Sequence, residues 1–316
     1  MSTLDSTLKI GGVTIKNPLV LAPMAGYTDA SMRLLCAEAG VGLTVTEMVS
    51  AKGLVYSPDK CEPLLITSDA ETVKCVQLFG HEPDYFYEAL TSFPHLEKFD
   101  IIDINMGCPV PKIVRNGEGS ALINNPSLAE EIVIATVKGA KGRPVTVKTR
   151  VGFDENEDVS VEFCKRMVGA GASAITLHGR TRAQGYAGTA DWDKIERLRD
   201  ILSVPVIGSG DVNEHNASQL ISRASALMIG RAVVGDPYIF ARILGKDSTE
   251  PYYQTALRHF DLMSEFYGEK YAFTNFRHHV GGYLRGVRGQ KDIKIALYSS
   301  QSHSAMREIL SAIGQN

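Results

Sequence analysis

Cys108 is the residue with the clearest chemical potential in this sequence of 316 residues. It ends the run Asn105-Met106-Gly107-Cys108, followed by Pro109, in a glycine-containing turn where core packing explains a thiol poorly. An ordinary thiol has a pKa near 8.5, so at neutral pH it stays protonated and can give a proton to a carbanion or enolate. No histidine lies close in sequence to activate it as a nucleophile, although a neighbour in space is an open alternative. We therefore interpret Cys108 as a general acid.

Eight apolar, strand-like segments alternate with helix-like segments and supply the frame that must position this thiol. Their content of Val, Ile and Leu on both faces is typical of parallel strands covered by helices. The regular count predicts an α/β fold, a (β/α)8 TIM barrel. An open doubly wound sheet is the alternative, but no dinucleotide fingerprint follows the first strand. The expected strands are Asn17–Ala22, Gly42–Glu47, Lys74–Phe79, Ile101–Asn105, Pro144–Thr149, Ala174–His178, Val204–Gly208 and Ala226–Gly230.

Helices are expected between the strands and throughout the tail, and a short hairpin at residues 9–15 precedes the first strand. Strand signals stop near Gly245, so we predict a barrel at 1–245 and a small all-helical C-terminal domain at 246–316. The inter-strand helices are expected at Asp29–Ala39, Pro83–Ser92, Ser127–Lys138, Val159–Ala170, Trp192–Leu202 and Glu214–Ser222. Those of the tail are expected at Tyr252–Tyr267, Phe273–Gly286, Asp292–Tyr298 and His303–Ile313.

Small and polar residues follow nearly every predicted strand, at the barrel end where chemistry takes place in this fold. After strands seven and eight come Ser209-Gly210-Asp211 and Gly230-Arg231. Glycines there let backbone N–H groups approach an anion, and Arg231 can add a charge-assisted contact. Either turn alone is better explained as a tight βα connection. The pair favours a ligand that carries a phosphate.

Three further strand-end residues, Gln77, Lys148 and His178, predict a donor-rich wall in the same mouth. Taken singly, Lys148 fits a salt bridge and His178 a satisfied rim histidine. Together they suit a planar ring that gains negative charge on reduction, namely a flavin. Met24 and Ala25 would pack against that ring.

The tail is basic. Six cations lie between Tyr271 and Arg307 against one acid, Asp292. A solvated helical face is the usual explanation of such charge, and a surface that contacts RNA phosphates is the alternative. The net charge of −3 disfavours a basic coat over the whole chain.

The remaining composition is that of an ordinary soluble protein. The five cysteines are widely spaced without a CxxC pair, which disfavours a disulfide framework or a zinc site and fits a reducing cytoplasm. No run approaches the roughly 18 apolar residues of a membrane helix, and no signal peptide is visible. We expect a cytoplasmic protein without a metal, which acts as a monomer and does not bind membranes.

The order of these motifs resembles the dihydrouridine synthases that act on tRNA, over essentially the whole chain. The tail segment FRHHVGGYLRG, Phe276–Gly286, resembles the helical-domain motif of that family. The barrel motifs are PMAGYTD (Pro23–Asp29), QLFG (Gln77–Gly80), INMGCP (Ile104–Pro109), VKTRVGFD (Val147–Asp154), LHGRTR (Leu177–Arg182), IGSGD (Ile207–Asp211) and MIGRA (Met228–Ala232).

The resemblance implies a barrel that binds FMN, a helical domain that binds tRNA, and NADPH as the transient electron donor. Hydride would pass from reduced FMN to C6 of a uridine, and Cys108 would protonate C5. The base must leave its stack for this reaction. The uridine contacts implied are Asn105 and Arg182, with Arg277, His278 and Arg285 of the tail as tRNA contacts. The FMN contacts implied are Pro23, Met24, Ala25, Gln77, Lys148, His178, Ser209, Gly210, Asp211, Gly230 and Arg231.

One position departs from the family pattern, which often has Asn-Gly-Asp where this chain has Ser209-Gly210-Asp211. The backbone donors persist there, while the side-chain contact changes. Two alternative functions fit part of the pattern: another FMN barrel, such as a dihydroorotate dehydrogenase, and a non-catalytic RNA-binding barrel. The sequence does not encode which uridine is modified or whether NADPH is preferred to NADH.

Overall fold

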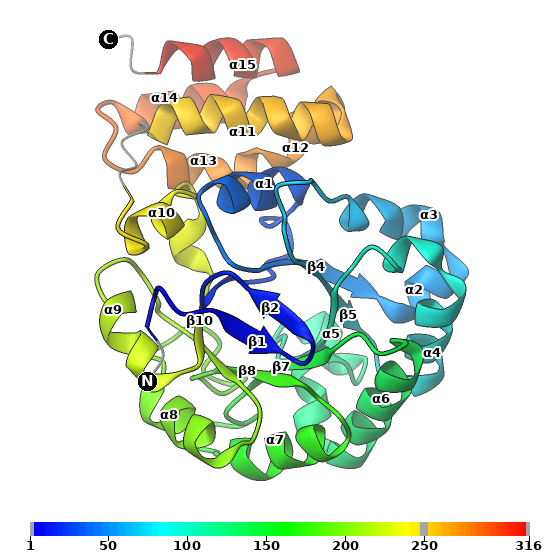
Figure 1. Ribbon diagram of the computed structural model, residues 1–316. Coiled ribbons are helices and arrows are strands. Elements are labelled where there is room, and N and C mark those ends of the chain that lie inside the picture. The colour runs from blue at the N-terminus through cyan, green and yellow to red at the C-terminus, as the bar shows by residue number, and fades with distance from the viewer. Residues whose placement is uncertain (1–2, 247–251, 314–316) are drawn as a thin grey trace.

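Eight parallel strands form a single closed sheet in the computed structural model, which describes residues 3–246 and 252–313 (Figure 1). The strand order is β3-β10-β9-β8-β7-β6-β5-β4. The outer strands meet through a bridge between Val20 and Leu43 and a hydrogen bond of 2.9 Å from Leu21 N to Leu43 O. The predicted TIM barrel is thereby confirmed. The strands are β3 Leu19–Leu21, β4 Thr44–Ser50, β5 Lys74–Phe79, β6 Ile101–Met106, β7 Val145–Arg150, β8 Ala174–His178, β9 Val206–Ser209 and β10 Ala226–Ile229.

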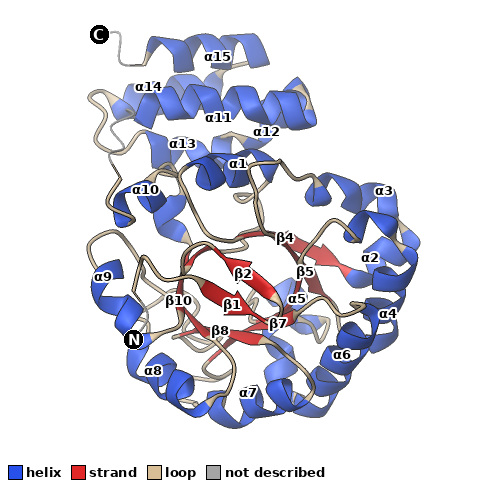
Figure 2. Cartoon of the chain, viewed as in Figure 1, coloured by secondary structure: helices blue, strands red, loops and turns tan. Residues whose placement is uncertain are grey.

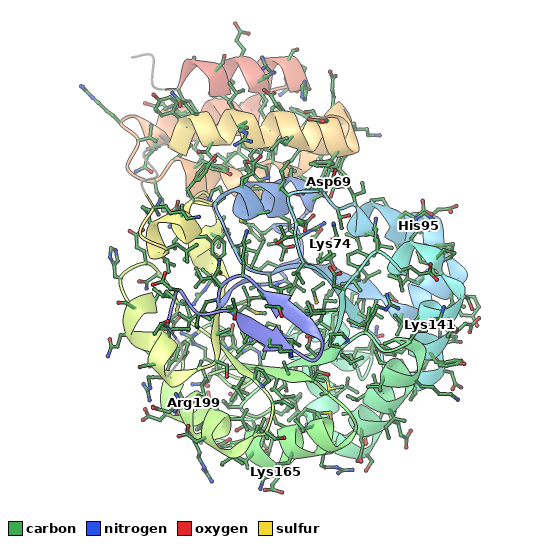
Figure 3. The ribbon with its side chains drawn as sticks, in the orientation of Figure 1. Asp69, Lys74, His95, Lys141, Lys165 and Arg199 are labelled. Carbon is green, nitrogen blue, oxygen red and sulfur yellow. The ribbon has the colours of Figure 1, made fainter. Side chains whose placement is uncertain are left out.

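Helices surround the barrel, and charged side chains of these helices and of the turns between them, such as Lys141, Lys165 and Arg199, lie on the outer rim (Figures 2 and 3). Apolar side chains from the helices and from the outer strand faces form one core between the two layers. The helices are α1 Ala30–Glu38, α2 Ala51–Tyr56, α3 Pro58–Cys61, α4 Pro83–Ser92, α5 Pro111–Arg115, α6 Pro126–Gly139, α7 Ser160–Gly169, α8 Trp192–Ile201, α9 Ala217–Leu220 and α10 Ile239–Ile243. Short 3₁₀ turns are η1 Glu62–Leu65, η2 Pro94–Leu96, η3 Gly119–Asn124, η4 Ile221–Arg223 and η5 Arg231–Val233.

The barrel interior is apolar at one end and polar at the other. The predicted hairpin, β1 Leu8–Ile10 and β2 Val13–Ile15, lies across the N-terminal end (Figure 1). Its buried side chains share a core cluster with interior residues of the strands, including Val20, Cys75 and Ile207. The apolar end is therefore closed. Polar side chains at the other end are left to form a site.

The C-terminal helices stack beside α1 and have a core of their own (Figure 1). They are α11 Tyr252–Tyr267, α12 Glu269–Asn275, α13 Arg277–Tyr283, α14 Gln290–Ser299 and α15 His303–Ala312. Two hydrogen bonds join them to the start of α1: Ala30 N donates to Tyr267 Oη at 2.8 Å, and His259 Nε2 lies 3.0 Å from Ser31 Oγ. The expected boundary after Gly245 borders residues 247–251, which lie outside the described residues.

Three expected elements differ from the structure. The helix expected at 273–286 is two helices, because the chain turns at Phe276, whose ring is buried between α11 and α13. The helix expected at 214–222 shrinks to α9 and η4, since Asn213 and Asn216 bind local backbone groups before it. The loop expected after β6 contains α5 and η3. In residues 3–246 and 252–313, no helix is long and apolar enough to span a membrane.

Candidate active site

The polar end of the barrel gathers the side chains that the strand-end argument singled out. In the strand pairing, Gln77 lies opposite Asp103, and Asn105 lies opposite Lys148. His178 of β8 lies opposite Ser209 of β9. Alternate residues of a strand share a face, so these side chains enter the same mouth.

Cys108 is half-buried, whereas the other four cysteines are buried. The carboxamide of Asn105 holds its loop, because Oδ1 accepts hydrogen bonds from Gly107 N at 3.2 Å and Cys108 N at 2.9 Å. Ser120 donates from both N and Oγ to the carbonyl of Cys108, at 3.1 and 2.8 Å. The thiol is thus presented by a loop fixed on both sides.

The surroundings of Cys108 favour a protonated thiol. Burial raises its pKa, although a backbone hydrogen bond at Val110 and the charges of Arg150 and Lys148 act in the opposite direction. Arg150 is itself buried, and its Nε donates to the Gly107 carbonyl at 2.8 Å. Its Nη1 donates to the Thr181 carbonyl at 2.9 Å, so this arginine joins the thiol loop to the loop after β8.

A chain of hydrogen bonds runs beneath this loop across three strands. Thr146 Oγ1 and Gln77 Nε2 each donate to the Asp103 carboxylate at 2.6 Å. Asn105 Nδ2 then donates to Gln77 Oε1 at 2.8 Å. Two predicted site residues, Gln77 and Asn105, are therefore joined directly, and Asp103 anchors both.

Lys148 and His178 provide the electrostatics of the mouth. Burial lowers the pKa of Lys148 to about 8, and the charge of Arg150 acts in the same direction. Burial, together with Lys148 and three arginines, lowers the pKa of His178 well below its usual range, so this ring is neutral. His178 Nδ1 lies 3.2 Å from the backbone N–H of Arg180, which makes it the acceptor and leaves Nε2 as the donor.

The turns after β9 and β10 form the predicted phosphate end. Gly210 has φ of +122°, and a Cβ there would lie 2.5 Å from Ala190 Cβ, so the turn requires glycine. The Asp211 carboxylate accepts from Arg180 Nη2 at 2.7 Å and from Arg231 Nη2 at 2.9 Å. Burial opposes these bonds, yet they hold the pKa of Asp211 below its usual range. Asp211 thus orients two guanidinium groups.

The loop after β3 carries the predicted residues Pro23, Met24 and Ala25. A Cβ on Gly230 would lie 3.5 Å from Met24 Sδ, so this loop crosses towards the end of β10. Met24 N is held by Thr28 Oγ1 at 2.8 Å. The two segments together form one side of the mouth.

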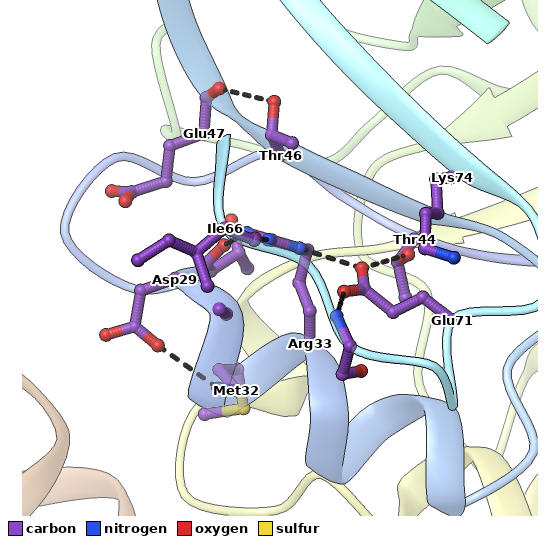
Figure 4. Close-up of polar contacts among 12 residues, drawn as sticks. Asp29, Met32, Arg33, Thr44, Thr46, Glu47, Ile66, Glu71 and Lys74 are labelled. Carbon is purple, nitrogen blue, oxygen red and sulfur yellow. Dashed lines mark hydrogen bonds and ion pairs between the residues drawn. The ribbon is translucent and has the colours of Figure 1, made fainter. Parts of the chain in front are cut away.

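A bulge in β4, between Val45 and Met48, explains why this strand continues to Ser50 rather than ending at Glu47 as expected. Beyond the bulge Met48 pairs with Gln77, and its sulfur lies 3.7 Å from Asn105 Nδ2. Glu47 turns to the other side, towards Asp29 (Figure 4). There its carboxylate accepts from Gly26 N, and burial raises its pKa.

Four predicted substrate contacts have protein partners in the structure. Arg182 lies over the Phe153 ring, 4.9 Å from its centroid. His278 Nδ1 lies 3.3 Å from the Gly26 carbonyl, and Arg277 Nη2 donates to the Ser300 carbonyl at 3.3 Å. Arg285 donates to the carbonyl of Val234 in the barrel. His278 and Arg285 therefore connect the tail to the barrel, and their contact with tRNA stays a prediction.

A cavity of about 610 Å³ opens beside the Cys108 loop. Glu118 lines it, and the neighbouring Gly119 packs against Cys108, since a Cβ there would lie 2.9 Å from the Cys108 carbonyl oxygen. The cavity is lined by Ser50, Lys52, Gly53, Tyr56, His81, Glu82, Asn116 and Glu118. These lining residues include none of the predicted flavin or uridine contacts.

The sequence argument missed Asp103, Thr146, Arg150 and Arg180. All four are buried. Asp103 binds Gln77, Arg150 binds the Cys108 loop and Arg180 binds Asp211, while Thr146 binds Asp103. A signal for Asp103 existed, because it is a lone acid in an apolar strand and shares a strand face with Asn105. The arginines bind loops that are distant in sequence, which no local pattern reveals.

Comparison with known proteins gives the same family across nearly the whole chain. A family model described as "Dihydrouridine synthase (Dus)" matches residues 20–315. The chain is 37% identical over 290 residues to "tRNA-dihydrouridine synthase B" of Vibrio parahaemolyticus, covering 88% of this chain and 89% of that protein. It is 40% identical over 277 residues to "Probable tRNA-dihydrouridine synthase" of Rhizobium leguminosarum bv. phaseoli, covering 86% of each.

The fold also matches solved barrels at low identity. The old yellow enzyme from Trypanosoma cruzi aligns with a TM-score of 0.60 and 12% identity, over 84% of this chain and 97% of that one. This likeness shows a shared barrel architecture.

Proposed function

The chain belongs to the dihydrouridine synthase family, and we propose that it is a tRNA-dihydrouridine synthase that reduces the 5,6 double bond of tRNA uridines. We propose FMN as its bound cofactor and NADPH as the transient donor that reduces the FMN. The observation that carries this proposal is the half-exposed Cys108 thiol, held by Asn105 in a mouth that also contains Lys148 and His178.

The residues of the mouth fit a flavin nucleotide. Among the described residues the side chain of Lys148 has no hydrogen-bond or ion-pair partner, and Arg180 Nη1 is buried without a partner. Gln77, Lys148 and neutral His178 would hold the ring edge as donors. Gly210, Gly230 and Arg231 would hold the phosphate, and residues 23–25 would pack on the ring. When bound, a flavin supplies a hydride to an electron-poor carbon.

The chain itself supplies the proton and the positioning. Asn105 would orient the uracil ring and the thiol loop together, since it already binds Cys108 N. Cys108 would give its proton to C5 of the ring whose C6 receives the hydride. A uridine in a loop is the natural target because unstacked bases can be placed in a pocket.

The direct test is chemical. Purified protein loaded with FMN is incubated with NADPH and an unmodified tRNA transcript, and nucleosides are analysed by mass spectrometry. We expect dihydrouridine, and mapping tRNA from a strain lacking this protein would identify the positions. Turnover of free dihydroorotate without any tRNA product would instead support the rival FMN barrel. A colourless protein that binds tRNA and does not take up flavin would support the non-catalytic barrel.

Lys148 provides a test that is independent of tRNA. Its positive charge should stabilise the negative charge that a flavin gains on reduction, so Lys148→Met should lower the midpoint potential of bound FMN by roughly 60 mV, about 2.7 kcal/mol for two electrons. The pKa of Lys148 is about 8, so the wild-type advantage should shrink as pH rises through that value. Lys165→Met, on the outer rim, is the matched control and should leave the potential unchanged. Equal potentials in the Lys148 variant and wild type would contradict the assignment.

The exposed cations near the start of α14 are the strongest candidates for RNA phosphate contacts. Arg288 and Lys291 form no ion pair within the described part of the chain, whereas Arg307 is bound to Asp261 at 2.7 Å. Each phosphate contact contributes roughly 0.7–0.9 to the slope of log affinity against log salt. Arg288→Ala and Lys291→Ala should each reduce the measured slope by about that amount, while Lys141→Ala on the barrel rim should not. Unchanged slopes in both tail variants would move the RNA surface elsewhere.

A further inference from the structure

Asp103 lies inside the barrel, where an ionised carboxylate is costly. Its side chain is 4% exposed. Burial raises its pKa from 3.8 to about 6, although hydrogen bonds from Gln77 and Thr146 and the charge of Lys148 oppose this rise. The folded pKa exceeds the unfolded one, so the free energy of unfolding falls as pH rises through about 6. Asparagine would avoid this cost, which suggests that the carboxylate serves something other than stability.

The carboxylate dictates the orientation of two carboxamides. It can only accept hydrogen bonds, so Gln77 must place Nε2 towards Asp103, at 2.6 Å. Gln77 Oε1 then faces Asn105, which must place Nδ2 towards it at 2.8 Å. Asn105 Oδ1 is left to accept from the backbone N–H of Cys108 at 2.9 Å. Reversing either amide would set donor against donor or acceptor against acceptor.

We propose that Asp103 is a positioning residue for the uridine reduction: by accepting from Gln77 it fixes the orientation of Gln77 and Asn105, and through them the loop of Cys108. This rests on the function proposed above. Gln77 keeps one N–H and one lone pair for the flavin ring, because its other groups are committed. The second N–H of Asn105 faces only the weak acceptor Met48 Sδ, at 3.7 Å, which a uracil oxygen would replace. A charge inside the barrel thereby sets which edge each amide shows to its ligand.

The first test measures the reaction of reduced, FMN-loaded protein with tRNA in a single turnover at pH 8. The side chain of Asp103→Asn has one carbonyl oxygen, which can face either Gln77 or Thr146, so it does not fix the orientation of Gln77. The side chain of Asp103→Leu has no hydrogen-bond acceptor. We expect a fall in rate of at least about tenfold in both variants. Both variants should still fold and take up FMN, and Asp103→Asn should be no less stable to heat than wild type. If wild type forms dihydrouridine and both variants react at a rate within twofold of the wild-type rate, the inference is overturned and the proposed function stands. Absence of product with wild type would instead defeat the proposed function.

The pH dependence separates positioning from simple structural support. The titratable groups that face Asp103 are Cys75 on β5 and Lys148 on β7. Protonated Asp103 carries one O–H donor and no longer obliges Gln77 to place Nε2 towards it, so the wild-type rate should fall as pH drops through about 6. This acid limb should vanish in Asp103→Asn. Thr146→Val removes one hydrogen bond to the carboxylate, which should move the limb to higher pH. An acid limb that persists unchanged in Asp103→Asn would contradict the inference.

The rate of Cys108 alkylation tests the role of Asp103 without cofactor or substrate. Cys108 is half-buried and the other four cysteines are buried, so limited alkylation of the native, flavin-free protein reports on Cys108. We expect faster alkylation in Asp103→Leu, because the Asn105 bond to Cys108 N loses its fixed geometry. Thr146→Val should match wild type. Equal alkylation rates in Asp103→Leu and wild type would show that the loop does not depend on Asp103.

Discussion

Cys108→Ala should lower the rate of dihydrouridine formation by roughly 10²–10⁴-fold while reduction of the bound FMN by NADPH stays near wild type. The alanine removes the proton donor and leaves Lys148, His178 and the phosphate end in place. Asn105 still binds the backbone N–H of residue 108, which keeps the loop in position. The two half-reactions are followed separately by flavin absorbance, first with NADPH and then with tRNA.

Cys108→Ser is the matched control for this prediction. Serine preserves the size and the hydrogen-bonding capacity of the side chain but is a far weaker acid than a thiol, so its activity should lie between wild type and alanine. Burial raises the pKa of Cys108, so the thiol stays protonated through neutral pH and the wild-type rate with tRNA should fall only in clearly alkaline solution. Wild-type turnover in Cys108→Ala would remove Cys108 from the mechanism.

The fold was predictable where local patterns and tertiary needs agree. The observed bounds of β5, β8, α4 and α11 equal the expected ones, because each is an apolar or amphipathic run with clear breaks at both ends. α5 was missed although Pro111 marks its first turn, since a helix of 5 residues depends on its surroundings more than on propensity. The bulge in β4 was also unpredictable, because its cause is the pairing with β5.

The positions of the site residues at strand ends were predictable from the sequence, whereas the hydrogen bonds between these residues were not. Gln77, Lys148 and His178 were expected in one mouth because each ends a barrel strand, and Asn105 was added by the family resemblance. The strand register brings these four positions to the same end of the barrel, and their roles stay predictions. The positions of strand ends do not reveal which side chains form hydrogen bonds with each other. The bond between Gln77 and Asn105, and their common dependence on Asp103, follow from barrel closure and the relative shift of the strands.

The two adjacent glycines of α13 allow a matched test of how the helical tail meets the barrel. A Cβ on Gly282 would lie 2.5 Å from the Val234 carbonyl oxygen and 2.8 Å from Gly235 N, both backbone atoms that cannot move aside cheaply. A Cβ on Gly281 would find nothing nearer than Lys294 Nζ, at 4.0 Å. Alanine favours a helix over glycine by roughly 0.5–1 kcal/mol at either position, so the difference between the variants isolates the contact with the barrel.

Gly282→Ala should therefore destabilise the protein by about 1–3 kcal/mol and weaken turnover on tRNA, whereas Gly281→Ala should be neutral or slightly stabilising. Calorimetric unfolding measures the first effect, and dihydrouridine formation at limiting tRNA the second. The loss on tRNA should appear mainly in KM, because the clash displaces the tail from the barrel and leaves the Cys108 loop untouched. Flavin reduction by NADPH should stay at wild-type rate in both variants. Equal behaviour of the two glycine variants would mean that the tail does not need this close contact to hold tRNA over the barrel mouth.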